Sequence, residues 1–225
     1  DDGDGYSEDD GDCNDCDSSN GQSQTVDTKG KAIHILSAAG PESTIITGYT
    51  FTNAIRCDSG ESRDTIIEGF LITGGFATYG GGIYIEDSAP TIKNCKFEYN
   101  FAKDMGGAIL AVGVVLEDGE YIGPKIINCE FQNNESLSWG GAVMGHTTSM
   151  ILIGCSFESN SSAEYGGAVG LYTELEDKTF EHEIVECDFN ENESGVNGGA
   201  LWSYNQSSEV RECTFINNYS SNNGG

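Results

Sequence analysis

The sequence predicts an all-β solenoid, a parallel β-helix of about seven coils that follows a short irregular acidic segment. Two short motifs recur together at a fixed period, which is the signature of stacked repeats. The apolar segments between them are four to six residues long, β-branched and alternating, as strands are. No stretch combines ten residues of 3.6-residue periodicity with helix caps, so helical repeats are excluded.

The repeat joins a Gly-Gly-Ala motif to a later Cys-x-Phe-x-x-Asn motif. Its cysteines follow one another in steps of 34, 26, 32 and 26 residues, and its phenylalanines and asparagines keep the same steps. A period of 26 residues with two insertions accounts for every step. The insertions, VGVVLEDGEYIGP and YTELEDKTFEHE, are expected to form loops on one side. Short strands and glycine corners at this period describe coils stacked roughly 4.8 Å apart.

Two earlier coils can be aligned by their apolar pattern alone. TIIEGFLITGG matches TIKNCKFEYNF, which places Gly69 in the cysteine slot. KAIHIL matches NAIRCD in the same way. We therefore assign residues 21–225 to the β-helix and residues 1–20 to the acidic segment.

Stacking places each slot of the repeat above its own copy. One slot is expected to form an inward aliphatic ladder and another an inward phenylalanine ladder. The asparagine slot is expected at a turn, because Asn tolerates left-handed backbone and its amide can bond to the next copy. The glycine pair supplies another corner without a Cβ. These ladders comprise Ile83, Ile109, Val143, Val169 and Leu201; Phe97, Phe131, Phe157, Phe189 and Phe215; and Asn100, Asn134, Asn160, Asn192 and Asn218.

Five of the eight cysteines share one slot and form a predicted core ladder: Cys95, Cys129, Cys155, Cys187 and Cys213. The rung spacing lies within the Cα range that a disulfide accepts, so distance alone leaves pairing open. Side chains stacked in register are poorly aimed for a disulfide, and we expect buried free thiols. Cys57 aligns with Ile85 and is expected in the core. A metal site is disfavoured because His34, His146 and His182 share no slot.

The paired motifs Gly-Gly-Ala-Ile/Val and Phe-x-x-Asn are similar to the repeats of polymorphic outer-membrane proteins. At these residues the chain resembles the right-handed parallel β-helices of the pectate-lyase-like class. The resemblance covers about residues 30–225, and both half-motifs recur in five coils. It implies a right-handed solenoid that is secreted or displayed on a cell surface and is often associated with adhesion. It implies no reaction.

The acidic segment DDGDGYSEDDGDCNDCDSS has nine acids in its first 17 residues. Its DGDGY resembles the centre of the EF-hand-like calcium loops of dockerins and thrombospondin type 3 repeats. This resemblance implies Ca²⁺ as a cofactor, with Gly5 at the turn. The usual first Asp would precede residue 1, and Gly11 falls where a closing Glu is usual, so the site would be incomplete, unusual or completed by a neighbouring chain. The implied ligands are Asp2, Asp4 and the Tyr6 carbonyl, with Glu8, Asp10 and Asp12 as candidates to complete the shell.

Two alternatives stay open for this segment. A run of acids is commonly a solvated tail, which would bind no ion. The CNDC sequence is either a Cys13–Cys16 disulfide or half of a zinc site. We favour the disulfide for an extracellular protein, since no second cysteine pair lies nearby.

The charge balance limits the partners of the chain. Ten Lys and Arg stand against 37 Asp and Glu, and the formal charge of −27 repels nucleic acid and anionic membranes. No run of 18 apolar residues occurs, so no membrane insertion is expected. We expect an extracellular or cell-surface structural protein that is stabilised by calcium.

A non-catalytic role is expected because the outward slots beside Phe and Cys do not gather acids next to an arginine. Arg56, Arg63 and Arg211 fall in different coils, and no serine-hydrolase, metalloprotease or nucleotide-binding motif occurs. The alternative is a carbohydrate-active β-helix enzyme, a polysaccharide lyase or hydrolase, and hydrolysis would need a pair of carboxylates. The acidic insertions, at 117–120 and 174–177, are where such a site would be sought.

Aromatic residues along one corner suggest a carbohydrate or other cell-surface ligand. Tyr79, Trp139 and Tyr165 precede their glycine pairs, and Trp202 lies just beyond its own pair. Rings stacked along one edge are able to hold sugar rings. The alternative is that they pack beneath the loops and stiffen the corner.

The last residues, SSNNGG, read as the opening of another coil and include no polar cap of the kind that solenoids usually carry. An uncapped coil exposes strands that can pair with another chain. We therefore expect either a segment of a longer protein or head-to-tail self-association into a stalk, adhesin or filament, with the calcium loop completed at the junction.

Overall fold

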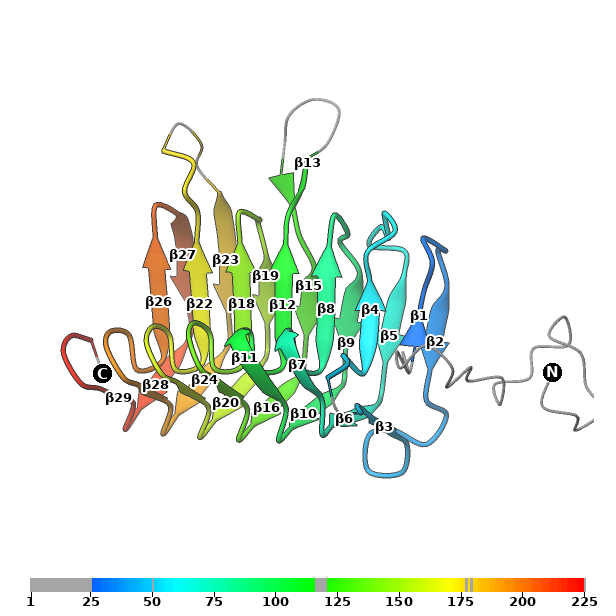
Figure 1. Cartoon of the computed structure of the whole chain (residues 1–225), viewed down its shortest axis with the longest axis horizontal. Helices are drawn as coiled ribbons and strands as arrows, with labels where there is room; N and C mark the ends of the chain where they lie inside the picture. The colour runs from blue at the N-terminus through cyan, green and yellow to red at the C-terminus, as the bar shows by residue number, and fades with distance from the viewer. Residues whose placement is uncertain (1–25, 50, 116–120, 177, 179, 225) are drawn as a thin grey trace, which may run out of the picture.

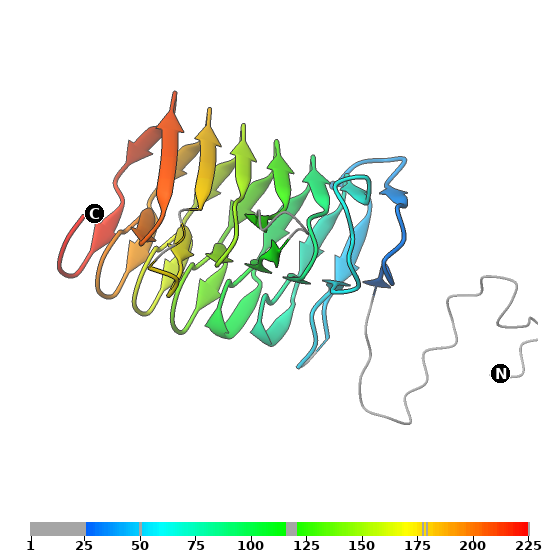
Figure 2. The same ribbon diagram turned by 90° about the horizontal axis from the view of Figure 1, so that it is seen from above.

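The computed structural model describes residues 26–49, 51–115, 121–176, 178 and 180–224. Its strands stack into four parallel sheets along one axis, and the described residues contain no helix. Neighbouring strands of a sheet come from successive coils, as Figures 1 and 2 show. The predicted right-handed parallel β-helix of about seven coils is confirmed. The assigned acidic segment, residues 1–20, lies outside the described residues.

The four sheets, A to D, follow one another around each coil. Sheet A contains β1 (Val26–Asp27), β4 (Ile55–Cys57), β8 (Ile83–Glu86), β12 (Ile109–Val112), β18 (Val143–His146), β22 (Val169–Tyr172) and β26 (Leu201–Tyr204). Sheet B contains β2 (His34–Leu36), β5 (Ile66–Glu68), β9 (Thr91–Lys93), β15 (Lys125–Ile127), β19 (Ile151–Ile153), β23 (Glu181–Val185) and β27 (Ser207–Arg211). Sheet C contains β3 (Ile45–Thr47), β6 (Leu71–Thr73), β10 (Lys96–Glu98), β16 (Glu130–Gln132), β20 (Ser156–Glu158), β24 (Asp188–Asn190) and β28 (Thr214–Ile216). Sheet D contains β7 (Phe76–Tyr79), β11 (Phe101–Met105), β17 (Glu135–Ser136), β21 (Ser161–Ser162), β25 (Glu193–Ser194) and β29 (Tyr219–Ser220).

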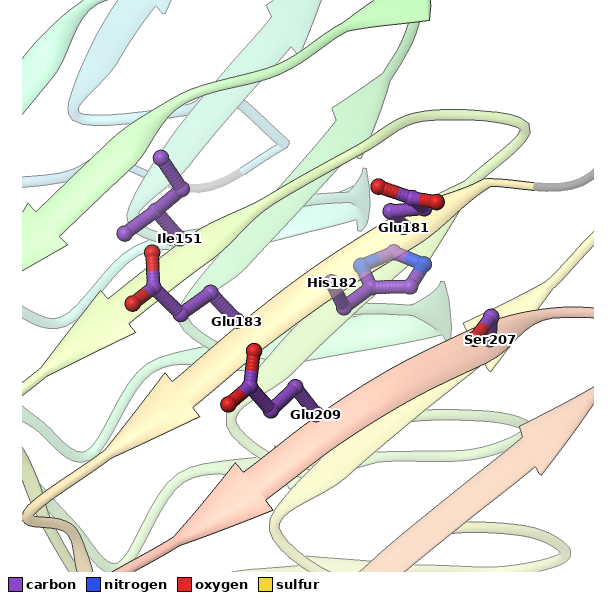
Figure 3. A pocket seen from close by; sticks show the side chains of 6 residues that line it. All are labelled: Ile151, Glu181, His182, Glu183, Ser207 and Glu209. Atoms are coloured by element: carbon purple, nitrogen blue, oxygen red, sulfur yellow. The ribbon is translucent and has the colours of Figure 1, made fainter.

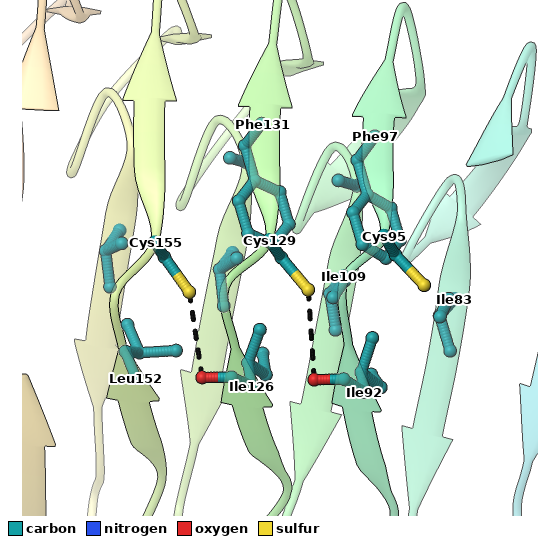
Figure 4. Packing of buried hydrophobic residues seen from close by; sticks show 14 of the residues in the cluster. Ile83, Ile92, Cys95, Phe97, Ile109, Ile126, Cys129, Phe131, Leu152 and Cys155 are labelled. Atoms are coloured by element: carbon teal, nitrogen blue, oxygen red, sulfur yellow. Dashed lines mark hydrogen bonds between the residues drawn. The ribbon is translucent and has the colours of Figure 1, made fainter. Parts of the chain in front are cut away.

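The interior consists of ladders of like side chains, as the repeat predicts. Ile109 of β12 pairs with Ile83 on one side and Val143 on the other, which is the expected aliphatic ladder. The phenylalanine rings stack nearly parallel from Phe97 to Phe215, with neighbouring centroids 4.7–4.8 Å apart. Figure 4 shows both ladders beside the cysteines. Each buried aliphatic or Phe side chain stabilises the fold by about 1.5–3 kcal/mol.

The cysteine slot lies in the same core. Cys95, Cys129, Cys155 and Cys187 are buried, Cys213 is half-buried, and all six described cysteines are free thiols. The Cys129 Sγ lies 3.3 Å from the Ile127 carbonyl and 3.8 Å from that of Ile92, the second contact being drawn in Figure 4. Burial raises the pKa of Cys129 well above its ordinary value, which keeps the thiol protonated and inert. Cys57 pairs with Ile85 and is buried, as expected.

The asparagine slot forms a continuous ladder of hydrogen bonds. The Asn160 Nδ2 donates to Asn192 Oδ1 and to the Phe131 carbonyl, both at 3.0 Å. The Asn160 Oδ1 accepts from the backbone N–H and from Nδ2 of Asn134, again at 3.0 Å. The same pattern runs from the Asn100 coil to the Asn218 coil. Because Asn160 is fully buried, these bonds replace water for every polar atom of its amide.

The expectation that the ladder asparagines themselves adopt left-handed backbone is wrong. The residue before each of them is left-handed, as Ser159 is with φ 54°. The turn therefore occurs one residue earlier, and the asparagine side chain points into the stack to satisfy its neighbours. The left-handed residues of this corner are Tyr99, Asn133, Ser159, Glu191 and Asn217.

The glycine pair closes another corner, for two different reasons. Gly140, the first of its pair, has φ 67°, and a Cβ there would lie 2.5 Å from the Val143 carbonyl oxygen. A Cβ on Gly141 would lie 2.0 Å from the Gly167 oxygen of the next coil. The first position thus requires glycine for its conformation and the second for the close approach of the adjacent coil.

The two insertions leave the solenoid between sheets A and B, on the same side of the rod (Figure 1). The first contains a short antiparallel hairpin of β13 (Val114–Val115) and β14 (Tyr121–Ile122). The alignments of the two early coils are wrong. Leu71 pairs with Lys96, so Phe70 and not Gly69 occupies the Cys95 slot. The stretch at 34–36 belongs to sheet B, whereas that at 55–57 belongs to sheet A.

A buried carboxylate joins the first three coils. Glu61 is 2% exposed, and its pKa reflects two opposing effects. Burial alone would raise the pKa of Glu61, but the hydrogen bonds that its carboxylate accepts outweigh burial and lower the pKa to about 2. The donors are Thr28 Oγ1 (2.6 Å), the Gly30 N–H (2.6 Å), the Ser59 N–H (2.9 Å) and Ser88 Oγ (2.7 Å).

Candidate functional site

Five aromatic side chains gather over one edge of sheet A in the last coils. Trp139 and Tyr165 come from the segments that precede their glycine pairs, and they form a parallel bridge with each other. Tyr172 comes from β22, and Trp202 and Tyr204 come from β26. Tyr204 is 51% exposed and the other four are half-buried. We call these five residues the aromatic surface.

The rings of the aromatic surface form one connected group. Tyr172 and Trp202 differ in ring plane by 11°, and Trp202 and Tyr204 by 15°, with centroids 6.1 Å apart in each pair. Tyr165 stacks on Trp202 at 4.6 Å, and Trp139 lies 4.8 Å from Tyr172. Because the rings come from strands and corners of stacked coils, the backbone sets the spacing between them.

Two carboxylates flank the aromatic surface. The Trp139 Nε1–H donates to Glu164 Oε2 at 2.8 Å, and the Tyr172 hydroxyl donates to Glu174 Oε1 at 3.5 Å. The His146 ring lies 5.6 Å from that of Tyr172, and burial lowers the pKa of His146, so it is uncharged at neutral pH. Apolar ring faces with hydrogen-bonding groups at their margin suit a sugar, which has both apolar and polar faces.

The structure brings together three of the four residues predicted to contact carbohydrate. Trp139, Tyr165 and Trp202 belong to the aromatic surface, whereas Tyr79 pairs with Met105 and is separated by it from the Trp139 coil. Sequence reasoning missed the other two tyrosines, at 172 and 204. They pair with each other across consecutive coils as the fourth residues of their sheet A strands, so comparing that slot would have found them.

A concave region lies on sheet B, apart from the aromatic surface, and has a volume of about 450 Å³. Its lining includes three glutamates from β23 and β27 (Figure 3). The Arg211 guanidinium lies 2.6 Å from Glu183 and 3.1 Å from Glu209. Acids therefore do gather beside an arginine on the outer face of sheet B. This grouping lies outside the slots beside Phe and Cys from which the sequence predicted no such cluster. The lining residues are Ile151, Glu181, His182, Glu183, Ser207 and Glu209.

His182 lies beneath this concave region and is 3% exposed. Its Nδ1 accepts the Met150 N–H at 3.2 Å, so the ring proton is on Nε2, which contacts the Gln206 side-chain oxygen. Burial lowers the pKa of His182 to about 4. The ring is therefore neutral at neutral pH, and its hydrogen bonds hold it in the core.

The predicted metal and disulfide residues of the acidic segment lie outside the described residues. They are Asp2, Asp4, Tyr6, Glu8, Asp10 and Asp12, together with Cys13 and Cys16. Within the described ranges, no group of three or more His, Cys, Asp or Glu is placed to hold a metal ion. The same ranges contain no helix that is long and apolar enough to cross a membrane.

Comparison with known proteins gives one match. The model of a family described as a right-handed β-helix region matches residues 54–225, well over half of the chain. Neither a curated protein nor a solved structure matches the chain significantly.

Proposed function

The chain belongs to the right-handed β-helix family, and we propose that it is a non-catalytic extracellular or cell-surface protein, a stalk or adhesin whose aromatic surface binds carbohydrate. The observation that carries this proposal is the gathering of five aromatic rings from three coils on one edge of sheet A. Parallel coils repeat at roughly 4.8 Å, so such an edge presents rings in a fixed array.

The exposure of the rings supports a binding role over a purely structural one. Rings that only stiffened the corner would be expected to bury their faces, yet Trp139 and Tyr165, which have a coil on either side, are only half-buried. Tyr and Trp supply large contact area with little side-chain entropy to lose on binding. The net charge of −27, with ten Lys and Arg against 37 Asp and Glu, argues against nucleic acid as the ligand.

The test is isothermal titration calorimetry with a panel of soluble oligosaccharides. Wild type is expected to bind at least one, and Trp202→Ala and Tyr204→Ala are expected to weaken binding at least about tenfold. Tyr49→Ala is the matched control, because Tyr49 is 69% exposed but lies in an early coil. Failure of wild type to bind any oligosaccharide, or an equal loss in the control, would refute the proposal.

The alternative, a carbohydrate-active enzyme, draws on the carboxylates of the concave region on sheet B. The Arg211 guanidinium already engages both Glu183 and Glu209, which leaves neither free to act alone as a general acid or nucleophile. Polysaccharide digestion followed by reducing-end and unsaturated-product assays decides this point. Activity that is lost in Glu183→Gln and retained in Tyr204→Ala would favour the enzyme.

We also propose that Ca²⁺ orders the acidic segment and that the rods self-associate head to tail through it. The support is the DGDGY pattern of the acidic segment, whose alternating Asp residues and glycine turn are typical of calcium loops. Negative-stain electron microscopy with calcium and then with chelator tests this. Filaments that disperse in chelator would support it, and single short rods in both conditions would exclude it.

A further inference from the structure

We propose that the polysaccharide bound by the aromatic surface carries free amino groups, as polymers of deacetylated amino sugars do. This inference rests on the proposed carbohydrate-binding function and adds the chemical class of the sugar. It follows from three features of the site: the anchored carboxylates, the ring faces over which no lysine or arginine of the described residues lies, and the charge of the surroundings.

The first feature is that both flanking carboxylates are held against the rings. Glu164 is anchored by the Trp139 indole N–H at 2.8 Å, and Glu174 lies 3.5 Å from the Tyr172 hydroxyl. Both glutamates are exposed, and a carboxylate has about four acceptor positions, so each keeps free acceptors toward solvent. A sugar ring seated on the aromatic surface beside Trp139 and Tyr172 would have these carboxylates at its margin, where an ammonium substituent can bond.

The second feature is that the ring faces carry no cation of the protein. Among the described residues, cations lie over Tyr84, Phe51 and Phe76, all outside the aromatic surface. Aromatic faces attract an ammonium group through their quadrupole. Because the protein leaves these faces without a lysine or arginine, a ligand cation is able to take that place.

The third feature is the local charge. The described residues of the insertion that directly follows Tyr172 include two exposed acids, Glu174 and Glu176, against one lysine, Lys178. His146, the nearest histidine ring, is uncharged at neutral pH because burial lowers its pKa. An acidic polysaccharide would meet repulsion here, both locally and from the net charge of −27. An amino polysaccharide would be attracted instead.

Calorimetric titration with three matched oligosaccharides tests the inference: a glucosamine oligomer, its N-acetylated form and a galacturonate oligomer of equal length. At about pH 6, the Kd for the glucosamine oligomer is expected to be roughly tenfold lower than for the N-acetylated form, with the galacturonate weakest. Glu164→Gln and Glu174→Gln each remove one negative charge and are each expected to reduce the ratio of the two Kd values roughly threefold. Glu158→Gln, an exposed carboxylate on sheet C, is the matched control for general attraction to the acidic protein.

The outcomes separate the inference from the function on which it rests. Equal Kd values for the amino and N-acetylated oligomers, both weakened by Trp202→Ala, would overturn the inference and leave carbohydrate binding intact. A preference that Glu158→Gln reduces as much as Glu164→Gln would also overturn it, because the attraction would then be non-specific. Tightest binding of the galacturonate oligomer would contradict it directly. No binding of any oligomer would refute the proposed function itself.

Discussion

Breaking the asparagine ladder in its middle is expected to destabilise the fold strongly. Asn160→Ala removes four hydrogen bonds, two accepted from Asn134 and one donated to each of Phe131 and Asn192. It leaves two donors of Asn134, the backbone N–H and one Nδ2–H, without an acceptor in a position that is 0% exposed. At about 1–3 kcal/mol for each unsatisfied buried group, the free energy of unfolding should fall by about 2–6 kcal/mol.

The last coil supplies a matched control. Asn218 makes the same contacts to the coil before it but is itself half-buried, so truncating its side chain opens the two Asn192 donors that lose their acceptor to water. The expected loss there is only about 1 kcal/mol. Urea unfolding followed by far-ultraviolet circular dichroism measures both variants. A loss below about 1 kcal/mol for Asn160→Ala, or equal losses for the two variants, would show that the ladder does not stabilise the stack as argued.

Four further predictions concern stability. Glu61→Gln should lower the free energy of unfolding by about 3 kcal/mol at neutral pH. The Glu61 carboxylate stabilises the wild-type fold fully above about pH 4.5 and loses this effect as the pH falls toward 2. The difference between the two proteins in urea unfolding should therefore shrink in acid. The pKa of His182 is lowered from 6.5 to about 4, so the free energy of unfolding of wild type should fall by up to about 3 kcal/mol as the pH drops from about 6.5 to 4. His182→Gln should flatten that part of the plot of unfolding free energy against pH. A plot that this substitution leaves unchanged would contradict the buried neutral ring. Gly141→Ala should lower the free energy of unfolding by at least about 2 kcal/mol in the same assay, since its Cβ would lie 2.0 Å from the Gly167 oxygen. An unchanged free energy of unfolding would mean that the two coils can move apart to accept the methyl group. Chelation of calcium should lower the melting temperature of wild type but not of a variant with Asp2 and Asp4 changed to Asn, and equal shifts would exclude the acidic segment as the site.

The repeated coils could be predicted well because the residue type in several slots is restricted. Each of these slots meets its own copy in the next coil, and few residue types fit such a neighbour. A glycine fits the close corner, an asparagine amide bonds to the next asparagine, and a phenylalanine ring stacks on the next ring. Gly141, Asn160 and Phe157 therefore mark their slots in the sequence. The early coils lack these markers. There, β-branched alternation fits adjacent registers equally well, and Gly69 was placed one position away from its true slot.

Other features could not be predicted because they depend on contacts across coils. Glu61 looks like a surface acid in the sequence, yet donors from three coils converge on it. The left-handed residue before each ladder asparagine varies in type, as Ser159 and Glu191 show, so no motif marks it. The acids beside Arg211, Glu183 and Glu209, are 26 residues apart in the sequence, and only the pairing of β23 with β27 places them side by side.

Tryptophan fluorescence tests the central claim most directly, because both tryptophans of the chain, Trp139 and Trp202, belong to the aromatic surface. Titration with a bound oligosaccharide is expected to give a saturable change in emission whose midpoint matches the calorimetric Kd. The change should be lost in Tyr204→Ala and retained in Tyr49→Ala. Emission that stays constant while the oligosaccharide binds would place the binding site elsewhere on the β-helix and contradict the account.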